Sequence, residues 1–391
     1  MKGAFVTDAR SIASLATVRS LGSRGIFVAS GESFRYNYSF YSRYARRRVL
    51  YSEPTVQPEA FLGDLRREIA SGRYGTVLSF RDDVNVLISR NREEIGRHVR
   101  LCLAPTEALL TARDKGKTVL AAAAAGVPTP KTFFPEETPI RDIARRLDFP
   151  VLVKPRVSSG ARGIEHATDP SDLMEKYDKV KRIYGEPIVQ EFIDHSREHL
   201  SACFLFNHAS RLRASFVYQE LRQYPVNGGP ATFAVSVKNP DVVRLGTELL
   251  EGLGWKGVAH IDFLVDPRDN RPKLLEINPR FWMSLPLAVF CGVDFPYLLY
   301  EIALSGDVEP VTDYRAGRFY RWLLPADILW FLGARKSWRN LRTFLSPGGD
   351  HTCYAVLSKR DPLPALGFLL QSIYFLSSRS RRQFILNRGW P

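Results

Sequence analysis

The chain has 391 residues, a net charge of +14 and 45% apolar residues, which predicts two or three globular domains rather than a disordered or fibrous protein. No two of the four cysteines have the spacing of a metal or redox motif, so we expect reduced, mostly buried thiols and a cytoplasmic protein. The first eleven residues contain no long apolar run, so export is not expected.

Residues 1–105 alternate short apolar runs with helical patterns. Strands are predicted at 3–7, 26–30 and 76–80, and helices at 11–25 and 59–75. This alternation favours a doubly wound, Rossmann-like parallel sheet. Neither a G-x-G-x-x-G motif after the first strand nor a Walker loop occurs, so a dinucleotide or P-loop site is disfavoured.

The carboxyl ends of these strands carry polar residues, and ligands of doubly wound sheets bind beyond such ends. Arginines there would suit an acidic substrate and aspartates an amine. The alternative is that they are turn residues without a ligand. The candidates for substrate contacts are Asp8, Arg10, Arg81, Asp82 and Asp83.

The middle of the chain continues with short apolar runs, helices and a proline-rich boundary at 127–139. Helices are expected at 113–126, 170–185, 240–255 and 292–306. Strands are expected at 149–155, 187–193, 199–206 and 213–220, followed by a hairpin at 260–280 with its turn at Asp269 and Asn270.

The hairpin holds the strongest chemical signal in the sequence. Because side chains alternate along a strand, His260, Asp262 and Leu264 should share one face, and Leu274, Glu276 and Asn278 another. Pairing would bring Asp262, Glu276 and Asn278 together, and three oxygen donors suit a hard cation such as Mg²⁺. Arg280 follows and can grip a phosphoryl or carboxylate oxygen at two points.

Two alternatives stay open for the hairpin. Its acids could form an ordinary solvated face, and His260 could be a packed, hydrogen-bonded histidine rather than a substrate contact.

A second signal is cationic. Lys154 ends a strand, with Arg156 on the same face, and the glycine loop from Ser158 to Gly163 follows. Small residues let backbone N–H groups approach phosphate oxygens. Lys115 lies in the first turn of the helix expected at 113–126. Each of these lysines has an ordinary surface role as its alternative.

The order of two lysines, a glycine loop, the acids Glu191 and Glu198, and an Asp…Glu-x-Asn-x-Arg hairpin resembles the ATP-grasp superfamily over about residues 1–310. The likeness is closest to predicted carboxylate–amine ligases related to carbamoyl-phosphate synthase and biotin carboxylase. It is carried by the N-terminal α/β unit and by "RDK", "GVPTPKT", "VLVKP", "YPVNGGPATFAVSV" and "LLEINPRFW". Met283 departs from the small residue expected after "FW".

The resemblance implies a substrate domain at 1–110, an ATP-grasp small lobe at 111–192 and a large lobe at 193–310. Residues 311–391 lie beyond it, and we expect them to form a basic helical extension. The resemblance also implies ATP with one or two Mg²⁺ ions, or Mn²⁺, held by Asp262, Glu276 and Asn278. Arg280 and Lys154 would be catalytic. The implied nucleotide contacts are Lys115, Lys154, Ser158, Ser159, Gly160, Gly163, Gln190, Glu191, Phe192, Ile193 and Glu198.

The activity implied is the joining of a small-molecule carboxylate to an amine through an acyl phosphate. Arg222, Gly228 and Gly229 would belong to a second loop over the site. The alternatives are an ATP-grasp kinase, a biotin-carboxylase-like enzyme and a regulatory protein that binds Mg-ATP without turnover.

Residues 311–391 carry thirteen Lys and Arg against four Asp, together with apolar and aromatic runs. Nucleic-acid binding is not expected, because no recognised module occurs. Two interpretations remain for this segment. One is a helical appendage that packs on the core or on a second subunit in a homodimer, and the other is peripheral docking on an anionic membrane.

Overall fold

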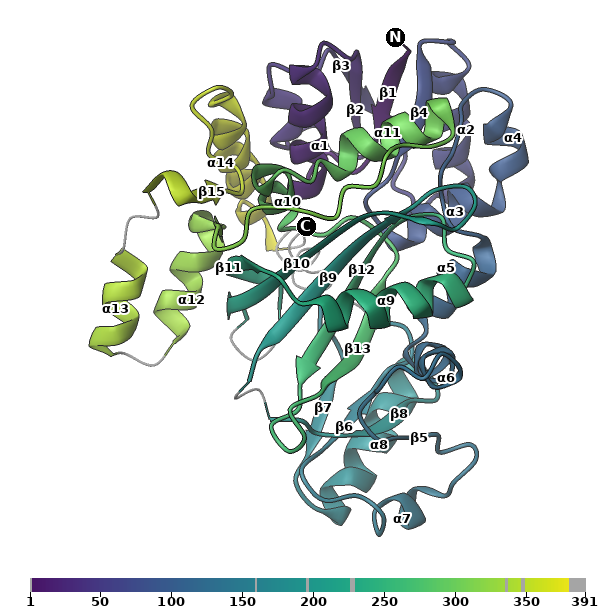
Figure 1. The fold of residues 1–391 in the computed structure, drawn as a ribbon, viewed down its shortest axis with the longest axis vertical. Helices are drawn as coiled ribbons and strands as arrows, with labels where there is room; N and C mark the ends of the chain where they lie inside the picture. The colour runs from purple at the N-terminus through teal and green to yellow at the C-terminus, as the bar shows by residue number, and fades with distance from the viewer. Residues whose placement is uncertain are drawn as a thin grey trace.

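The computed structural model describes residues 2–158, 160–194, 197–225, 229–334, 337–345 and 349–379 (Figure 1). A parallel sheet lies at one end of the molecule and a small antiparallel sheet at the other. A seven-stranded sheet lies between them. The expected mixed α/β architecture is therefore confirmed.

The N-terminal sheet has the strand order β3-β2-β1-β4, and all its pairings are parallel, as predicted. β3 was not predicted, because its sequence Arg-Arg-Val-Leu is charged and forms an exposed edge. The elements are β1 (Gly3–Val6), α1 (Ile12–Ser23), β2 (Val28–Glu32), β3 (Arg47–Leu50), α2 (Pro58–Ile69), β4 (Tyr74–Leu78), α3 (Asp82–Arg90) and α4 (Arg92–Gly96).

Two helices, α5 (Thr106–Arg113) and α6 (Lys115–Ala124), lead into the small lobe. Its sheet has the order β5-β8-β6-β7 and is antiparallel. The elements are β5 (Thr132–Phe133), α7 (Ile140–Ile143), β6 (Val151–Lys154), β7 (Glu165–Ala167), α8 (Pro170–Tyr184) and β8 (Ile188–Glu191).

The large sheet has the order β13-β12-β9-β10-β11-β14-β15. One face of it packs an apolar cluster that includes Ala202, Phe204 and Ile261 against α9. The opposite face carries polar side chains near the small lobe. The elements are β9 (His199–Phe206), β10 (Leu212–Gln223), β11 (Ala231–Val237), α9 (Pro240–Gly252), β12 (Gly257–Val265), β13 (Pro272–Asn278), α10 (Leu285–Cys291) and α11 (Phe295–Ser305).

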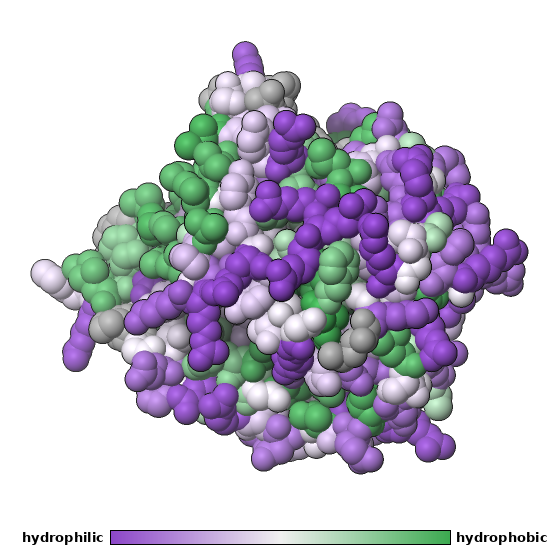
Figure 2. Space-filling model, turned by 90° about the horizontal axis from the view of Figure 1, so that it is seen from above, coloured by the Kyte–Doolittle hydropathy of each residue, from purple (hydrophilic) through white to green (hydrophobic). Residues whose placement is uncertain are grey.

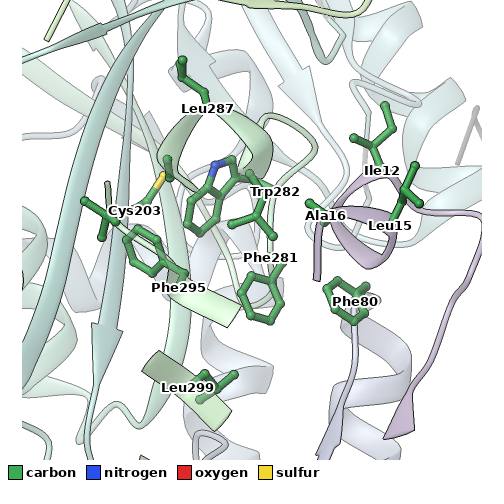
Figure 3. Close-up of a cluster of buried hydrophobic side chains, with 14 of the residues drawn as sticks. Ile12, Leu15, Ala16, Phe80, Cys203, Phe281, Trp282, Leu287, Phe295 and Leu299 are labelled. Carbon is green, nitrogen blue, oxygen red and sulfur yellow. The ribbon is translucent and has the colours of Figure 1, made fainter. Parts of the chain in front are cut away.

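An apolar core joins the N-terminal domain to the end of β13 (Figure 3). Ile12 and Leu15 of α1 belong to the same cluster as Phe281 and Trp282. The ring of Phe80, just after β4, stacks on Phe281 at a centroid distance of 4.9 Å. Burial of these rings fixes the segment that follows Asn278, so the chemistry-bearing hairpin is held against the N-terminal domain.

The C-terminal extension is not wholly helical. β14 (Phe319–Arg321) pairs with β11, and β15 (Thr352–Tyr354) pairs with β14, so the extension lengthens the large sheet. It also contains α12 (Ile328–Gly333), α13 (Trp338–Leu345) and α14 (Leu363–Leu376). Strands this short in an aromatic, arginine-rich context gave no period-two signal in the sequence.

In the part of the chain that the structure describes, no single helix is long and apolar enough to cross a bilayer. The bent pair α10 and α11 passes a test of length and composition. Its residues Leu285, Leu287, Phe295 and Ile302 are buried in the core.

Candidate active site between the two lobes

The hairpin of β12 and β13 pairs Asp262 with Glu276, and His260 with Asn278, as the alternation predicted. The register shifts after Asp262, so Phe263 is paired with Leu274. Leu274 therefore turns to the apolar face, where it is buried with Phe263. The prediction that Leu274 shares a face with Glu276 is wrong, because a bulge cannot be read from an apolar run such as Lys-Leu-Leu-Glu.

The three expected metal ligands lie together. Nδ2 of Asn278 donates to Oδ2 of Asp262 at 3.1 Å and lies 3.3 Å from Oε1 of Glu276. Oδ1 of Asn278 accepts from Nη2 of Arg280 at 3.1 Å. Two carboxylates that share one amide form a hard-oxygen donor set of the kind that Mg²⁺ prefers, and rotation of the amide would add a third oxygen.

Lys115 connects the hairpin with the glycine loop. Its Nζ is 3.2 Å from Oε2 of Glu276 and donates to the carbonyl oxygen of Ser158 at 3.0 Å. Asp114 caps α6 by accepting from two backbone N–H groups, which sets the position of Lys115 in the first turn. Burial raises the pKa of Glu276, but the Lys115 ammonium and hydrogen bonds outweigh it and lower that pKa to about 2. Glu276 is therefore an anion at neutral pH.

Lys154 is buried at the end of β6. Its Nζ donates to Oε1 of Gln190 at 2.6 Å, and Gln190 in turn donates to Oγ1 of Thr132 at 2.8 Å. Burial, reinforced by the nearby Lys115 ammonium and opposed by Glu276, lowers the pKa of Lys154 to about 8. Within the described chain no carboxylate lies at ion-pair distance from Lys154, so its charge suits an incoming anion.

The predicted hinge residues lie at the end of β8 and after it. Glu191 binds the backbone N–H of Lys131 at 2.7 Å and pairs with Arg268 at 2.8 Å, so its carboxylate is engaged within the protein. Ile193 is buried, Phe192 lies beside the ring of His166, and the side chain of Glu198 is exposed.

The glycine loop is described except for Ser159, which lies outside the described residues. Gly160 and Gly163 both have positive φ. A Cβ at Gly163 would lie 2.6 Å from the ring of Tyr184 and 2.8 Å from Pro155, so this position requires glycine.

The expected substrate residues of the N-terminal edge all have polar partners within the protein. Asp8 accepts from Oγ1 of Thr7 at 2.6 Å and from the backbone N–H of Phe80 at 3.1 Å. It therefore links the segments that follow β1 and β4. Burial, opposed by Arg81, raises the pKa of Asp8 to about 6. The ion pairs of this edge are Arg10 with Glu32 and Glu53, Arg81 with Glu53 and Asp83, and Asp82 with Arg280.

Arg222 does not form a second loop over the site. It is buried and pairs with Asp327 at 3.0 Å, with its guanidinium between the rings of Phe233 and Trp330. Arg222 thus lies in β10 rather than in a loop, and Asp327 of the extension, distant in sequence, satisfies its charge. Its expected contact with substrate stays a prediction. Gly228 lies outside the described residues, and Gly229 lies against the backbone of Tyr224.

His260 has the structural role that was left open as its alternative. Its Nε2 is 3.0 Å from the hydroxyl of Tyr218 and 3.5 Å from Oδ1 of Asp262, and its ring stacks on Trp282. Burial lowers its pKa. A neutral imidazole packed in this way orients Asp262.

A polar group beside Asp262 was not predicted from the sequence. Ser201 donates to Oδ1 of Asp262 at 2.7 Å and lies 3.3 Å from Glu220, while His199 lies 3.6 Å from Glu220. Burial, opposed by His199 and supported by Asp262, raises the pKa of Glu220 to about 7. The available signal was the alternation of His199 and Ser201 along β9 and of Tyr218 and Glu220 along β10.

The fold and this geometry define a two-lobed α/β protein with lysines and acids facing each other between its lobes. Residues 112–284 match a family model described as the ATP-grasp domain. The relatives found by sequence include acetyl-CoA carboxylase of Schizosaccharomyces pombe, which is 23% identical over 179 residues. That match covers 44% of this chain and 8% of the relative, so the chain spans a small part of the curated relatives it matches.

Solved structures share this fold over most of the chain. The biotin carboxylase domain of Hydrogenobacter thermophilus 2-oxoglutarate carboxylase, a dimer in complex with Mg-ADP, ADP and bicarbonate, has a TM-score of 0.65 at 15% identity. The match covers 82% of this chain and 73% of that one. The L-amino acid ligase of Bacillus licheniformis has a TM-score of 0.62 at 16% identity, with 82% and 78% covered.

Proposed function

We propose that this chain is an ATP-dependent ligase that activates a carboxylate as an acyl phosphate and joins it to an amine, with release of ADP and phosphate. The observation that carries the proposal is the meeting of Lys115 with Glu276 across the two lobes, beside Asp262 and the buried Lys154. Cations on one side and hard-oxygen anions on the other suit a triphosphate bound with a divalent ion.

Asp262 and Glu276 would hold Mg²⁺, or Mn²⁺, with the oxygen of Asn278 after rotation of its amide. A bound ion supplies neutralisation of the charge that gathers on the transferred phosphoryl group. The fit rests on the shared amide contact and on the low pKa of Glu276. His260 and Ser201 orient Asp262 from the other side.

Lys154 and Lys115 would bind the phosphate oxygens, and the loop from Ser158 to Gly163 would cover them. Lys115 already donates to the carbonyl of Ser158, so loop and cation can act together. Covering the site keeps water from the acyl phosphate until the amine attacks. Arg280, held by Asp82 at 3.0 Å, would steady the phosphoryl group or the acyl phosphate.

The residues of the site position substrates and neutralise charge, and the mechanism needs no nucleophile from the enzyme. Burial raises the pKa of all four cysteine thiols, so none is poised as a thiolate. The thiols are free, which supports the cytoplasmic location expected from the sequence.

The substrates that we propose are a small-molecule carboxylate and an amine. The likeness to an L-amino acid ligase favours this class. A carboxylase reaction is the second candidate, and the similarity to acetyl-CoA carboxylase and to a biotin carboxylase domain favours it. The two are separated by the co-substrate that ADP release requires, an amine in the first reaction and bicarbonate in the second.

An ADP-release screen of carboxylates and amines in pairs, with and without bicarbonate, tests the proposal. Release that needs both an acid and an amine is expected from the wild type. Glu276→Gln should lower the rate by about 10² or more, because a ligand and a charge are lost at the phosphoryl group. Turnover of the variant at the wild-type rate would refute the assigned site, and a requirement for bicarbonate would select the second candidate.

A further inference from the structure

The helix α14 is apolar around its whole circumference. Its buried residues are Pro364, Gly367, Gln371 and Phe375, which face the N-terminal domain. Gly367 lies against Tyr38 and Tyr41, and Phe368 lies beside the ring of Tyr38 at 5.9 Å. A helix that is hydrophobic on every side normally has partners on every side.

The opposite face of α14 is exposed. Its residues recur every three or four positions, and each is 48% to 58% exposed. We call Leu363, Leu366, Leu369, Ile373 and Leu376 the α14 face. No described residue covers the α14 face, so only an apolar partner from outside the described residues would remove it from water.

Exposed apolar side chains gather on the extension as a whole. Of the eighteen exposed large hydrophobic residues in the described chain, ten lie beyond residue 310. They include Leu332 of α12, and Trp338 of α13 at 86% exposure. Figure 2 shows hydrophobic residues gathered on the side of the molecule where Figure 1 places α12, α13 and α14. This concentration indicates that the extension, rather than the two lobes, is where another surface would bind.

Basic residues bracket the α14 face. Lys359 and Arg360 precede α14, Arg379 follows it, and all three are exposed. The sequence continues with Arg381, Arg382 and Arg388 and contains no acid after Asp361. Of the four aspartates of the extension, Asp327 and Asp361 are buried in ion pairs with arginines, so the exposed charge is strongly positive.

Two partners could cover the α14 face, a second copy of this chain or a lipid surface. The positive charge around the face distinguishes them. A symmetric dimer would place the same basic patch against itself, because a twofold interface brings each surface onto its own copy. An anionic bilayer offers opposite charge together with an apolar interior. α14 has 14 residues and is therefore about 21 Å long at 1.5 Å per residue, which suits a helix lying along a bilayer surface.

We propose that the α14 face docks this protein on anionic lipid membranes, with its leucines in the interface and its flanking Lys and Arg on the headgroups. In Figure 1, α14 lies beside the N-terminal sheet, and the small lobe that holds β6 and β8 lies at the opposite end of the molecule. Docking would therefore leave the site between the two lobes open to small-molecule substrates. The proposal does not depend on the reaction proposed above.

Co-sedimentation of the full chain with lipid vesicles, in the absence of nucleotide, tests the membrane docking that we propose. One set of vesicles is phosphatidylcholine, and the other is phosphatidylcholine and phosphatidylglycerol in equal parts. We expect at least about tenfold more protein bound to the anionic vesicles at low salt, and less binding as salt rises. The double variant Leu366→Glu/Ile373→Glu should lose that binding about tenfold or more, because two exposed apolar side chains become carboxylates that an anionic membrane repels.

The matched control is Leu50→Glu/Ile183→Glu, which places the same charges at exposed apolar positions of β3 and α8. It should bind as the wild type does. Absence of binding to anionic vesicles, retention of binding by the α14 variant, or an equal loss in the control would each overturn the proposal. Light scattering measures the oligomeric state of the wild type and of Leu366→Glu/Ile373→Glu. A wild-type dimer that the substitutions dissociate would show that a second copy covers the α14 face, and it would overturn the proposal.

Discussion

Lys154 is the residue whose burial is hardest to explain by stability. Its ammonium is buried against a neutral amide, and burial lowers its pKa to about 8. A buried ammonium without a carboxylate costs free energy in the unliganded protein. An anionic ligand would offset that cost, so the buried ammonium of Lys154 favours ligand binding rather than folding.

Lys154→Met should therefore separate activity from stability. Removal of the charge should lower ATP turnover by about 10² to 10³, because in the reaction we propose Lys154 is a cation at the transferred phosphoryl group. The free energy of unfolding should fall by no more than about 1 kcal/mol, since the lost hydrogen bond to Gln190 is offset by relief of the desolvation. Turnover and urea unfolding measure the two. Lys117→Met, on the exposed side of α6, is the control and should change neither.

The same lysine predicts a pH dependence of stability. Its pKa is lowered on folding from 10.5 to about 8, so between these values the unfolded chain holds a proton that the folded chain has released. The contribution of Lys154 to the unfolding free energy should then rise with pH across this window and be constant below it. Urea unfolding of wild type and Lys154→Met at several pH values measures the difference. A difference that does not change with pH would contradict the assignment.

At the scale of elements, the site depends on how α9 packs against the apolar face of the large sheet. Gly246 of α9 lies against the ring of Phe204 in β9, and β9 carries Ser201 on its other face. The missing side chain allows the helix to approach the strand. The position of Asp262 thus depends on a contact made on the apolar face of the same sheet.

Gly246→Ala should lower the free energy of unfolding by about 1 to 3 kcal/mol. A Cβ at Gly246 would lie 2.2 Å from Cζ of Phe204, so the helix or the ring must shift. Gly252→Ala, in the same helix with nothing within 4 Å, is the matched control. It should be neutral or raise stability by up to about 1 kcal/mol through helix propensity. Thermal or urea unfolding of both variants is the measurement, and equal effects would show that the close approach is not the cause.

At the scale of the whole molecule, the extension is locked to both halves of the protein by buried ion pairs. Asp361 accepts from Arg19 at 2.9 Å, from Ser42 at 2.8 Å and from the backbone N–H of Arg43 at 2.9 Å, all in the N-terminal domain. Asp327 binds Arg222 and Arg321 of the large sheet. These contacts hold α14 in place and orient its exposed face.

Asp361→Asn should loosen the extension. Loss of the carboxylate leaves Arg19 without its charge partner, at a cost of about 3 kcal/mol. Proteolysis should then cut between β14 and α14 sooner than in the wild type. Unfolding midpoints and a proteolysis time course measure the effect, with Asp350→Asn, at an exposed position, as the control. Unchanged cleavage in Asp361→Asn would show that the extension is held by its aromatic contacts instead.

Much of the fold could be predicted because local patterns carry it. The parallel N-terminal sheet, the helix expected at 113–126 and the shared face of Asp262 and Glu276 follow from short-range patterns of apolar and polar residues. The edge strand β3, the bulge after Asp262 and the strands of the extension have no such signal, since each depends on a neighbour that is distant in sequence.

The sequence by itself determined which chemistry the hairpin can offer, because residue types and a period of two place acids and an amide on one face. Tertiary structure alone decided which charges are free for a ligand. Arg222, Arg81 and Asp8 look as available in the sequence as Lys154 does. In the structure the two arginines pair with carboxylates and Asp8 accepts hydrogen bonds, whereas Lys154 donates to a neutral amide. The physical reason is that an ion pair depends on distance in space, and Asp327 reaches Arg222 across more than a hundred positions of the chain.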